Sequence, residues 1–118
     1  MRKKILVIDD DPAIRDIFKI IFERAGFDVT VESNGKMLMS DDYNCPDIFV
    51  LDRQLSGADG LDICSFLKHS ARSAHIPVVM VSASPDIASQ AILAGADDFL
   101  EKPFEMDMLI EKIEHLIG

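Results

Sequence analysis

Short apolar runs constrain the fold of this chain more than any other feature of its sequence. The clearest are residues 5–8 (ILVI), 48–51 (IFVL) and 78–81 (VVMV), in which consecutive rather than alternate positions are apolar. Runs of this kind are typical of strands that are covered on both faces, as in parallel sheets. The segments between them show helical periodicity, so the pattern predicts an α/β fold.

The segment after the first run carries the clearest helix signals. Asp11 is a suitable N-cap, Pro12 suits the first helical position, and Gly26 suits the end. The apolar residues between them recur every three or four positions, at Ile14, Ile17, Phe18, Ile21, Phe22 and Ala25. This spacing predicts a helix with one buried face.

Strands and helices alternate along the rest of the chain. The predicted strands are 4–8, 27–31, 47–51, 78–81 and 98–101. The predicted helices are 12–25, 36–42, 61–69, 84–95 and 106–117, the fourth being capped by Ser84 and Pro85. Such alternation implies a parallel sheet with helices on both faces. The 118 residues are enough for one domain with its own core, so we expect a single domain over residues 1–118.

Charge and hydropathy exclude several classes of function. The chain has 12 basic and 21 acidic residues, a net charge of −9, which would repel nucleic-acid phosphates. No apolar run approaches the roughly 20 residues that a membrane helix needs. The basic start is followed by only four apolar residues, unlike a signal peptide. We therefore expect a cytoplasmic location, without membrane contact or direct nucleic-acid binding.

The cysteines and histidines predict neither a disulfide nor a metal site. Cys45 and Cys64 are far apart in the sequence, and in a cytoplasmic protein we expect both to be free thiols. His69, His75 and His115 do not have the spacing of metal ligands, so we expect them at the surface.

Polar residues follow four of the five predicted strands. Asp9 and Asp10 follow the first, Asp52 the third, Ser82 the fourth and Lys102 the fifth. In such sheets ligands bind beyond the carboxyl ends of the strands. Carboxylates there would repel a dinucleotide but suit Mg²⁺, which accepts one or two carboxylates together with a phosphate. The pattern predicts a magnesium site where the lysine and serine contact a phosphoryl group.

Four stretches of the sequence resemble one known family. In chain order they are ILVIDDDP, DIFVLDRQLSGADG, VVMVSAS and GADDFLEKPF, and together they are similar to the receiver domain of two-component response regulators. The resemblance covers nearly the whole chain. It implies the CheY-like, flavodoxin-like fold, a five-stranded parallel sheet with strand order 2-1-3-4-5 flanked by five helices.

The resemblance also implies a reaction at the carboxylates. Asp52 would be the phosphoacceptor, taking a phosphoryl group from a sensor histidine kinase or a histidine phosphotransfer protein in a Mg²⁺-dependent reaction. Asp9, Asp10, Asp52 and the backbone carbonyl of Gln54 would bind the metal. The domain would catalyse only its own phosphoryl transfer and dephosphorylation, and would not be an enzyme acting on other substrates.

Three further residues take family roles by the same resemblance. Lys102 would pair with the phosphoryl group, and its peptide bond to Pro103 would be cis. Ser82 and Phe99 would form the conformational switch. The face formed by 84–95, 98–101 and 106–117 would contact an output domain, an effector or a second copy in a phosphorylation-dependent dimer.

Other interpretations of these residues stay open. Asp11 is better explained as a helix cap than as a ligand, and Phe99 by itself as a core residue. A phosphorylation-independent pseudo-receiver would usually lack an acidic residue or the lysine, and all are present. An aspartyl-phosphate phosphatase would carry Asp-x-Asp at the nucleophile, where this chain has Gln54. Two departures from the family pattern are Arg53, directly after the acceptor, and Ser56, where proline is common.

Overall fold

A parallel sheet forms the centre of the chain in the computed structural model, which describes residues 2–40, 43–55 and 57–118. Its strands are β1 (Lys4–Ile8), β2 (Asp28–Glu32), β3 (Ile48–Asp52), β6 (Val78–Ser82) and β7 (Asp98–Glu101). They lie in the order β2-β1-β3-β6-β7, and every neighbouring pair is parallel. Since β6 and β7 are the fourth and fifth strands of this sheet along the chain, the predicted order 2-1-3-4-5 is confirmed.

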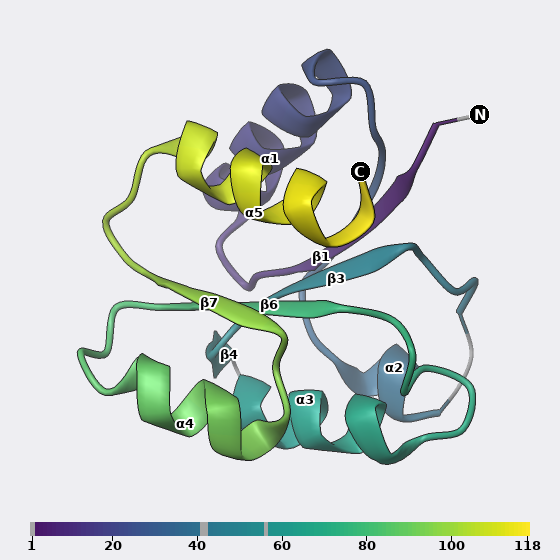
Figure 1. The fold of residues 1–118 in the computed structure, drawn as a ribbon, viewed down its shortest axis with the longest axis vertical. Helices are drawn as coiled ribbons and strands as arrows, with labels where there is room; N and C mark the ends of the chain where they lie inside the picture. Colours follow the sequence, from purple (N-terminus) through teal and green to yellow (C-terminus); the bar gives the residue numbers. More distant parts are fainter. Residues whose placement is uncertain (1, 41–42, 56) are drawn as a thin grey trace.

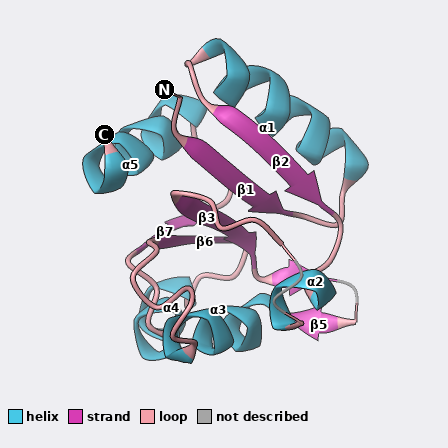
Figure 2. Cartoon of the chain, turned by 90° about the vertical axis from the view of Figure 1, so that its right-hand side faces the viewer, coloured by secondary structure: helices cyan, strands magenta, loops and turns pink. Residues whose placement is uncertain are grey.

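Helices cover both faces of the sheet. Figure 1 shows α1 (Pro12–Arg24) and α5 (Met106–Ile117) on one face, with α2 (Lys36–Met39), α3 (Gly60–His69) and α4 (Ile87–Ala94) on the other. The turned view in Figure 2 shows the same three layers. The architecture is therefore the doubly wound α/β fold that the sequence predicts.

Alternate residues of β1, β3 and β6 point into two separate cores. The core under α3 and α4 takes Leu6, Ile8, Phe49, Leu51, Val78 and Met80 from the strands. The core under α1 and α5 takes Ile5, Val7, Ile48, Val50, Val79 and Val81. Each fully buried side chain of this size contributes about 1.5–3 kcal/mol. The consecutive apolar residues of β1, β3 and β6 are thus needed to fill both cores.

The ends of α1 are as predicted, but its buried face is narrower. The Asp11 carboxylate accepts a hydrogen bond from the Ala13 N–H at 2.9 Å, and Gly26 follows the helix with φ of 101°. Phe18 and Phe22 are buried, whereas Ile17 is 46% exposed. Ile17 is turned by about 100° from Phe18 around the helix axis, so it lies outside the buried face and the expectation that it is buried is wrong.

The start of α4 corrects another prediction. The helix begins at Ile87 with Asp86 at the N-cap, and not at Ser84 and Pro85. The Ser84 hydroxyl is hydrogen-bonded to the Asp86 carboxylate instead of to a helical N–H, and Pro85 and Asp86 form a turn before the helix. The described part of α2 ends at Met39, and residues 41, 42 and 56 lie outside the described residues.

A short antiparallel pair follows β3 that the sequence analysis did not predict. It consists of β4 (Gln54–Leu55) and β5 (Ala58–Asp59). The Gly60 N–H then donates to the Arg53 carbonyl at 2.8 Å, which brings the start of α3 against the end of β3. Strands of two residues are too short to produce a pattern of alternation, so the sequence carries no usable signal for them.

Gly60 provides a test of this close approach. A Cβ at this position would lie 2.2 Å from the Asp52 carbonyl oxygen and 2.7 Å from the Arg53 Cα, both backbone atoms. We expect Gly60→Ala to lower the free energy of unfolding by about 1–3 kcal/mol, because the backbone must shift. Gly35→Ala is the matched control, since the nearest neighbours of its Cβ would be side-chain atoms of Ile63 and not backbone atoms. Equal losses for the two variants in urea denaturation would contradict this account.

Smaller expectations from the sequence are also met. Cys45 and Cys64 are free thiols, and His69, His75 and His115 are exposed. Within the described ranges, no helix has the length and apolar character needed to cross a bilayer.

Candidate functional site

Three carboxylates meet at the carboxyl edge of the sheet. Asp9 and Asp10 follow β1, and Asp52 is the last residue of β3, the neighbour of β1 in the sheet. One carboxylate oxygen from each lies within 4.8 Å of the others. Asp9 and Asp52 are only 1% and 5% exposed, and Asp10 is more exposed. The sequence predicted this convergence, and the structure brings the three residues together.

The Asp9 carboxylate is only partly satisfied by the protein. Its Oδ1 accepts a hydrogen bond from the Asp11 N–H at 2.9 Å. Its Oδ2 is buried and has no hydrogen-bond partner among the described residues, with the Lys102 Nζ 3.7 Å away. Burial raises the pKa of Asp9, and the nearby negative charge of Asp52 adds to this effect. A buried, under-satisfied carboxylate of this kind favours the binding of a cation.

The Asp52 carboxylate is held at both oxygens. Its Oδ1 accepts the Gln54 N–H at 3.1 Å, and its Oδ2 lies 3.2 Å from the Lys102 Nζ. The backbone after it is fixed as well, because the Arg53 N–H donates to the Val81 carbonyl at 3.0 Å. The carboxylate therefore has a defined orientation at the sheet edge.

Lys102 reaches this site from the end of β7. Its N–H donates to the Ser82 carbonyl at 2.7 Å, which anchors its backbone beside β6. Its Nζ pairs with both Asp52 and Asp9. The Lys102–Pro103 peptide bond is cis, as the resemblance implied.

The donor set fits a divalent hard cation. Three carboxylates supply oxygen ligands, the kind that Mg²⁺ prefers, and the buried Asp9 Oδ2 has no hydrogen-bond partner among the described residues. One lysine offsets part of the negative charge of the two buried aspartates. The predicted metal ligands therefore suit Mg²⁺, while the role of the Gln54 carbonyl as a further ligand stays a prediction.

The side chain of Ser82, a predicted site residue, is hydrogen-bonded to Gln54 and Ser84 and not to Asp52. It is fully buried, and no hydrogen bond joins it to Asp52 among the described residues. Its Oγ accepts the Gln54 Nε2–H at 2.9 Å and the Ser84 N–H at 3.0 Å. Phe99 packs half-buried against the core under α3 and α4. No local pattern in the sequence indicates the contact between Ser82 and the Gln54 side chain.

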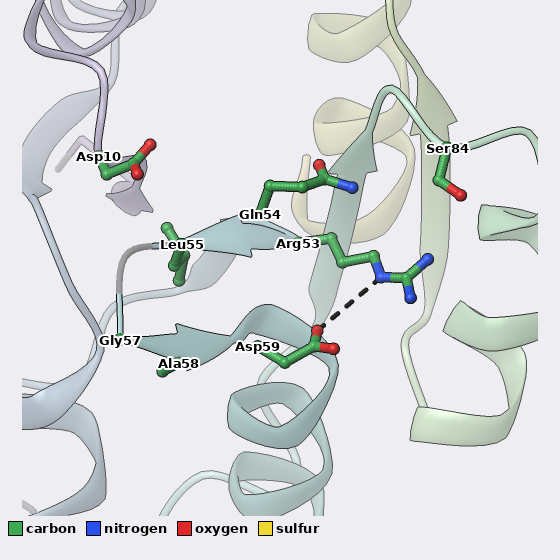
Figure 3. A pocket seen from close by; sticks show the side chains of 8 residues that line it. All are labelled: Asp10, Arg53, Gln54, Leu55, Gly57, Ala58, Asp59 and Ser84. Atoms are coloured by element: carbon green, nitrogen blue, oxygen red, sulfur yellow. Dashed lines mark ion pairs between the residues drawn. The ribbon is translucent and has the colours of Figure 1, made fainter.

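Arg53 links two loops beside the site. Its guanidinium lies 3.8 Å from Asp59 and 3.3 Å from Asp86, which cap α3 and α4. The Ser84 hydroxyl, and to a lesser degree Arg53, lower the pKa of Asp86. Figure 3 shows the Arg53–Asp59 pair at the edge of an open pocket of about 720 Å³, which is also lined by Asp10. Arg53 thus pairs with loop carboxylates.

Comparison with known proteins identifies related chains. The family model for the response regulator receiver domain matches residues 5–114. The DNA-binding dual master transcriptional regulator RpaA of Synechocystis is 38% identical over 117 residues, covering 97% of this chain and 48% of RpaA. The chain spans about half the length of the curated relatives that it matches.

Two solved structures are also similar. The receiver domain of Francisella response regulator 1452 has a TM-score of 0.87 and 34% identity, covering 98% of this chain and 97% of that one. The Thermotoga maritima response regulator TrrA, in complex with Mg²⁺ and beryllium fluoride, has a TM-score of 0.84 and 26% identity, covering 97% and 98%.

Proposed function

The chain belongs to the family of response regulator receiver domains, which accept phosphoryl groups in two-component signalling, and we propose that Asp52 is its phosphoacceptor. One observation carries this assignment. Among the three clustered aspartates, Asp52 has a carboxylate that is buried, oriented by the Gln54 N–H, and 3.2 Å from the Lys102 Nζ. Asp9 and Asp10 then serve as metal ligands.

In the proposed step a carboxylate oxygen of Asp52 attacks the phosphorus of a phosphohistidine. An O–P bond forms and the P–N bond breaks, and the electron pair of the P–N bond stays on the imidazole nitrogen. Lys102 already pairs with the carboxylate and can shift to a phosphoryl oxygen, which stabilises the transferred charge. Later hydrolysis of the acyl phosphate by water would return the carboxylate and release inorganic phosphate.

We assign the Mg²⁺ site to Asp9, Asp10, Asp52 and the Gln54 carbonyl. When bound, the ion supplies positive charge that neutralises the phosphoryl oxygens. The buried Asp9 Oδ2 supports this assignment, since it has no hydrogen-bond partner among the described residues and the Lys102 Nζ is 3.7 Å away. No observation favours the pseudo-receiver alternative, because the acidic residues and the lysine are all in place.

The partners follow from the same proposal. A histidine kinase or phosphotransfer protein would donate the phosphoryl group, and an output domain, effector or second copy would contact the face of α4, β7 and α5. Exposed apolar side chains on this face support it, with Ile92 68%, Leu93 87% and Met108 47% exposed. RpaA is named as a DNA-binding regulator. We assign any DNA binding to an output domain and not to this chain, because its net charge of −9 disfavours contact with nucleic acid. Its free cysteines suit the reducing cytoplasm.

The proposed function is tested by intact mass. We expect the native chain to gain the mass of one phosphoryl group when a small acyl phosphate and Mg²⁺ are supplied. Chelation of the metal should prevent the gain, because the acidic cluster then repels the donor. No mass gain with Mg²⁺, or an equal gain with chelator, would contradict the proposal.

The switch role of Ser82 gives a further prediction. We expect Ser82→Ala to accept the phosphoryl group, yet to show a severalfold smaller NMR shift change at Phe99 upon phosphorylation. The reason is that the hydroxyl, which would move toward the phosphoryl group, is absent. Ser84→Ala is the matched control, since the Ser84 hydroxyl contacts Asp86 and not the carboxylate cluster. An undiminished response in Ser82→Ala would refute the coupling.

A further inference from the structure

Gln54 contacts both the proposed phosphoacceptor and the proposed switch residue. Its backbone N–H donates to Asp52 Oδ1 at 3.1 Å, and its side-chain Nε2 donates to Ser82 Oγ at 2.9 Å. Its Oε1 also lies 3.3 Å from the same hydroxyl, within reach of the Ser82 proton. In Figure 3 the amide of Gln54 points across the pocket toward Ser84 and away from Asp10. One residue thus bridges the two parts of the site.

The backbone of Ser82 leaves its hydroxyl only one way to move. The Ser82 carbonyl accepts the Lys102 N–H at 2.7 Å, and the residue is paired with Glu101 in the sheet. The whole residue is 0% exposed. To approach a phosphoryl group on Asp52, the hydroxyl must therefore rotate about the Cα–Cβ bond while the backbone stays in place. Such a rotation breaks its present hydrogen bonds.

The strength of this restraint depends on the residue at position 54. The Ser84 N–H also donates to the Ser82 hydroxyl, at 3.0 Å, but a backbone donor is present whatever residue occupies position 84. Among the described residues, Gln54 is the one side chain bonded to that hydroxyl. Breaking a neutral hydrogen bond of this kind changes an equilibrium by roughly two- to tenfold.

We propose that Gln54 is a positioning residue that holds the Ser82 hydroxyl away from Asp52 and so opposes the phosphorylated conformation. The proposal rests on the function proposed above for Asp52 and Ser82. A side chain that cannot hydrogen-bond the hydroxyl would leave it freer to rotate. The phosphoryl-bound state would then be reached at lower cost.

The test uses Gln54→Met, which keeps the side-chain length and the backbone N–H and carbonyl. Gln54 is exposed, so this replacement leaves both cores intact. The measured quantity is the affinity of the full chain for beryllium fluoride, a phosphoryl mimic, with Mg²⁺ present and NMR as the readout. We expect roughly two- to tenfold tighter binding than in the native chain.

A double-mutant cycle with Ser82→Ala separates positioning from a general structural effect. In the Ser82→Ala background the gain from Gln54→Met should disappear, because no hydroxyl remains to be held. The role of Gln54 is overturned if Gln54→Met binds beryllium fluoride with the native affinity, or if its gain in affinity persists in the Ser82→Ala background. Binding by the native chain would in either case still support Asp52 as the phosphoacceptor. A native chain that binds no beryllium fluoride with Mg²⁺ overturns both proposals.

Discussion

Asp52→Asn is expected to abolish covalent phosphorylation of the chain. The variant keeps the shape of the side chain, and its Oδ1 can still accept the Gln54 N–H. It lacks the negatively charged oxygen that would attack phosphorus, and an amide is a far weaker nucleophile. With Mg²⁺ and an acyl phosphate, its intact mass should stay unchanged while the native chain gains one phosphoryl group.

Two further variants serve as controls for this experiment. Asp9→Asn and Asp10→Asn remove the same charge from the same cluster, but we place both residues among the metal ligands. These variants should lower the rate of phosphorylation at a given Mg²⁺ concentration. The phosphoryl group should still be found on the peptide that contains residue 52. If a phosphorylated peptide from either variant, or from the native chain, did not contain residue 52, the assignment of the acceptor would be wrong.

The convergence of the aspartates could be predicted because it depends only on topology. Asp9 and Asp52 each end a buried apolar strand, and neighbouring parallel strands end at the same edge. The strand order itself came from the resemblance to a family, since alternation of strands and helices is compatible with several orders. Asp11 was also predictable, because an N-cap is a local feature of sequence.

Features that depend on side-chain partners could not be predicted. The Ser82 hydroxyl is hydrogen-bonded to the side chain of Gln54, which is 28 residues away in the chain. Ser84 and Asp86 are both of residue types that cap helices, and α4 begins after Asp86. Asp86 contacts Arg53, which is distant in the sequence, and Gln90, which lies within the helix. No local pattern distinguishes the two candidates.

The acidic cluster should destabilise the chain when no metal is bound. Burial raises the pKa of Asp9 in the folded state above its unfolded value. The folded state therefore binds the proton more tightly, and stability falls as pH rises from the unfolded pKa through the folded pKa. The loss persists above both pKa values, because the charged form is desolvated and its Oδ2 has no hydrogen-bond partner among the described residues.

Asp9→Asn is expected to reverse this loss. An amide carries no charge to desolvate, its Oδ1 can keep the Asp11 N–H, and its Nδ2 can donate toward Asp52. In chelator at pH 7 we expect the variant to be more stable by about 1–3 kcal/mol, the cost of a buried unsatisfied group. The difference should shrink as pH falls through the raised folded pKa and below the unfolded value of 3.8, because Asp9 is then protonated in both states.

Magnesium should remove or reverse the stability advantage of Asp9→Asn over the native chain. At a hundredfold excess over its dissociation constant, a ligand stabilises the folded state by about 2.7 kcal/mol. The native chain should gain this amount, and Asp9→Asn should lose most of it because a buried ligand oxygen has become an amide. Asp10→Asn is the matched control. This variant should also weaken Mg²⁺ binding, but its gain in stability without metal should be smaller, because Asp10 is more exposed than Asp9. The test is to measure the melting temperatures of the native chain and the two variants, each with Mg²⁺ and with chelator. If Asp9→Asn melts no higher than the native chain in chelator, or gains as much from Mg²⁺, then Asp9 is not the buried ligand of a metal site.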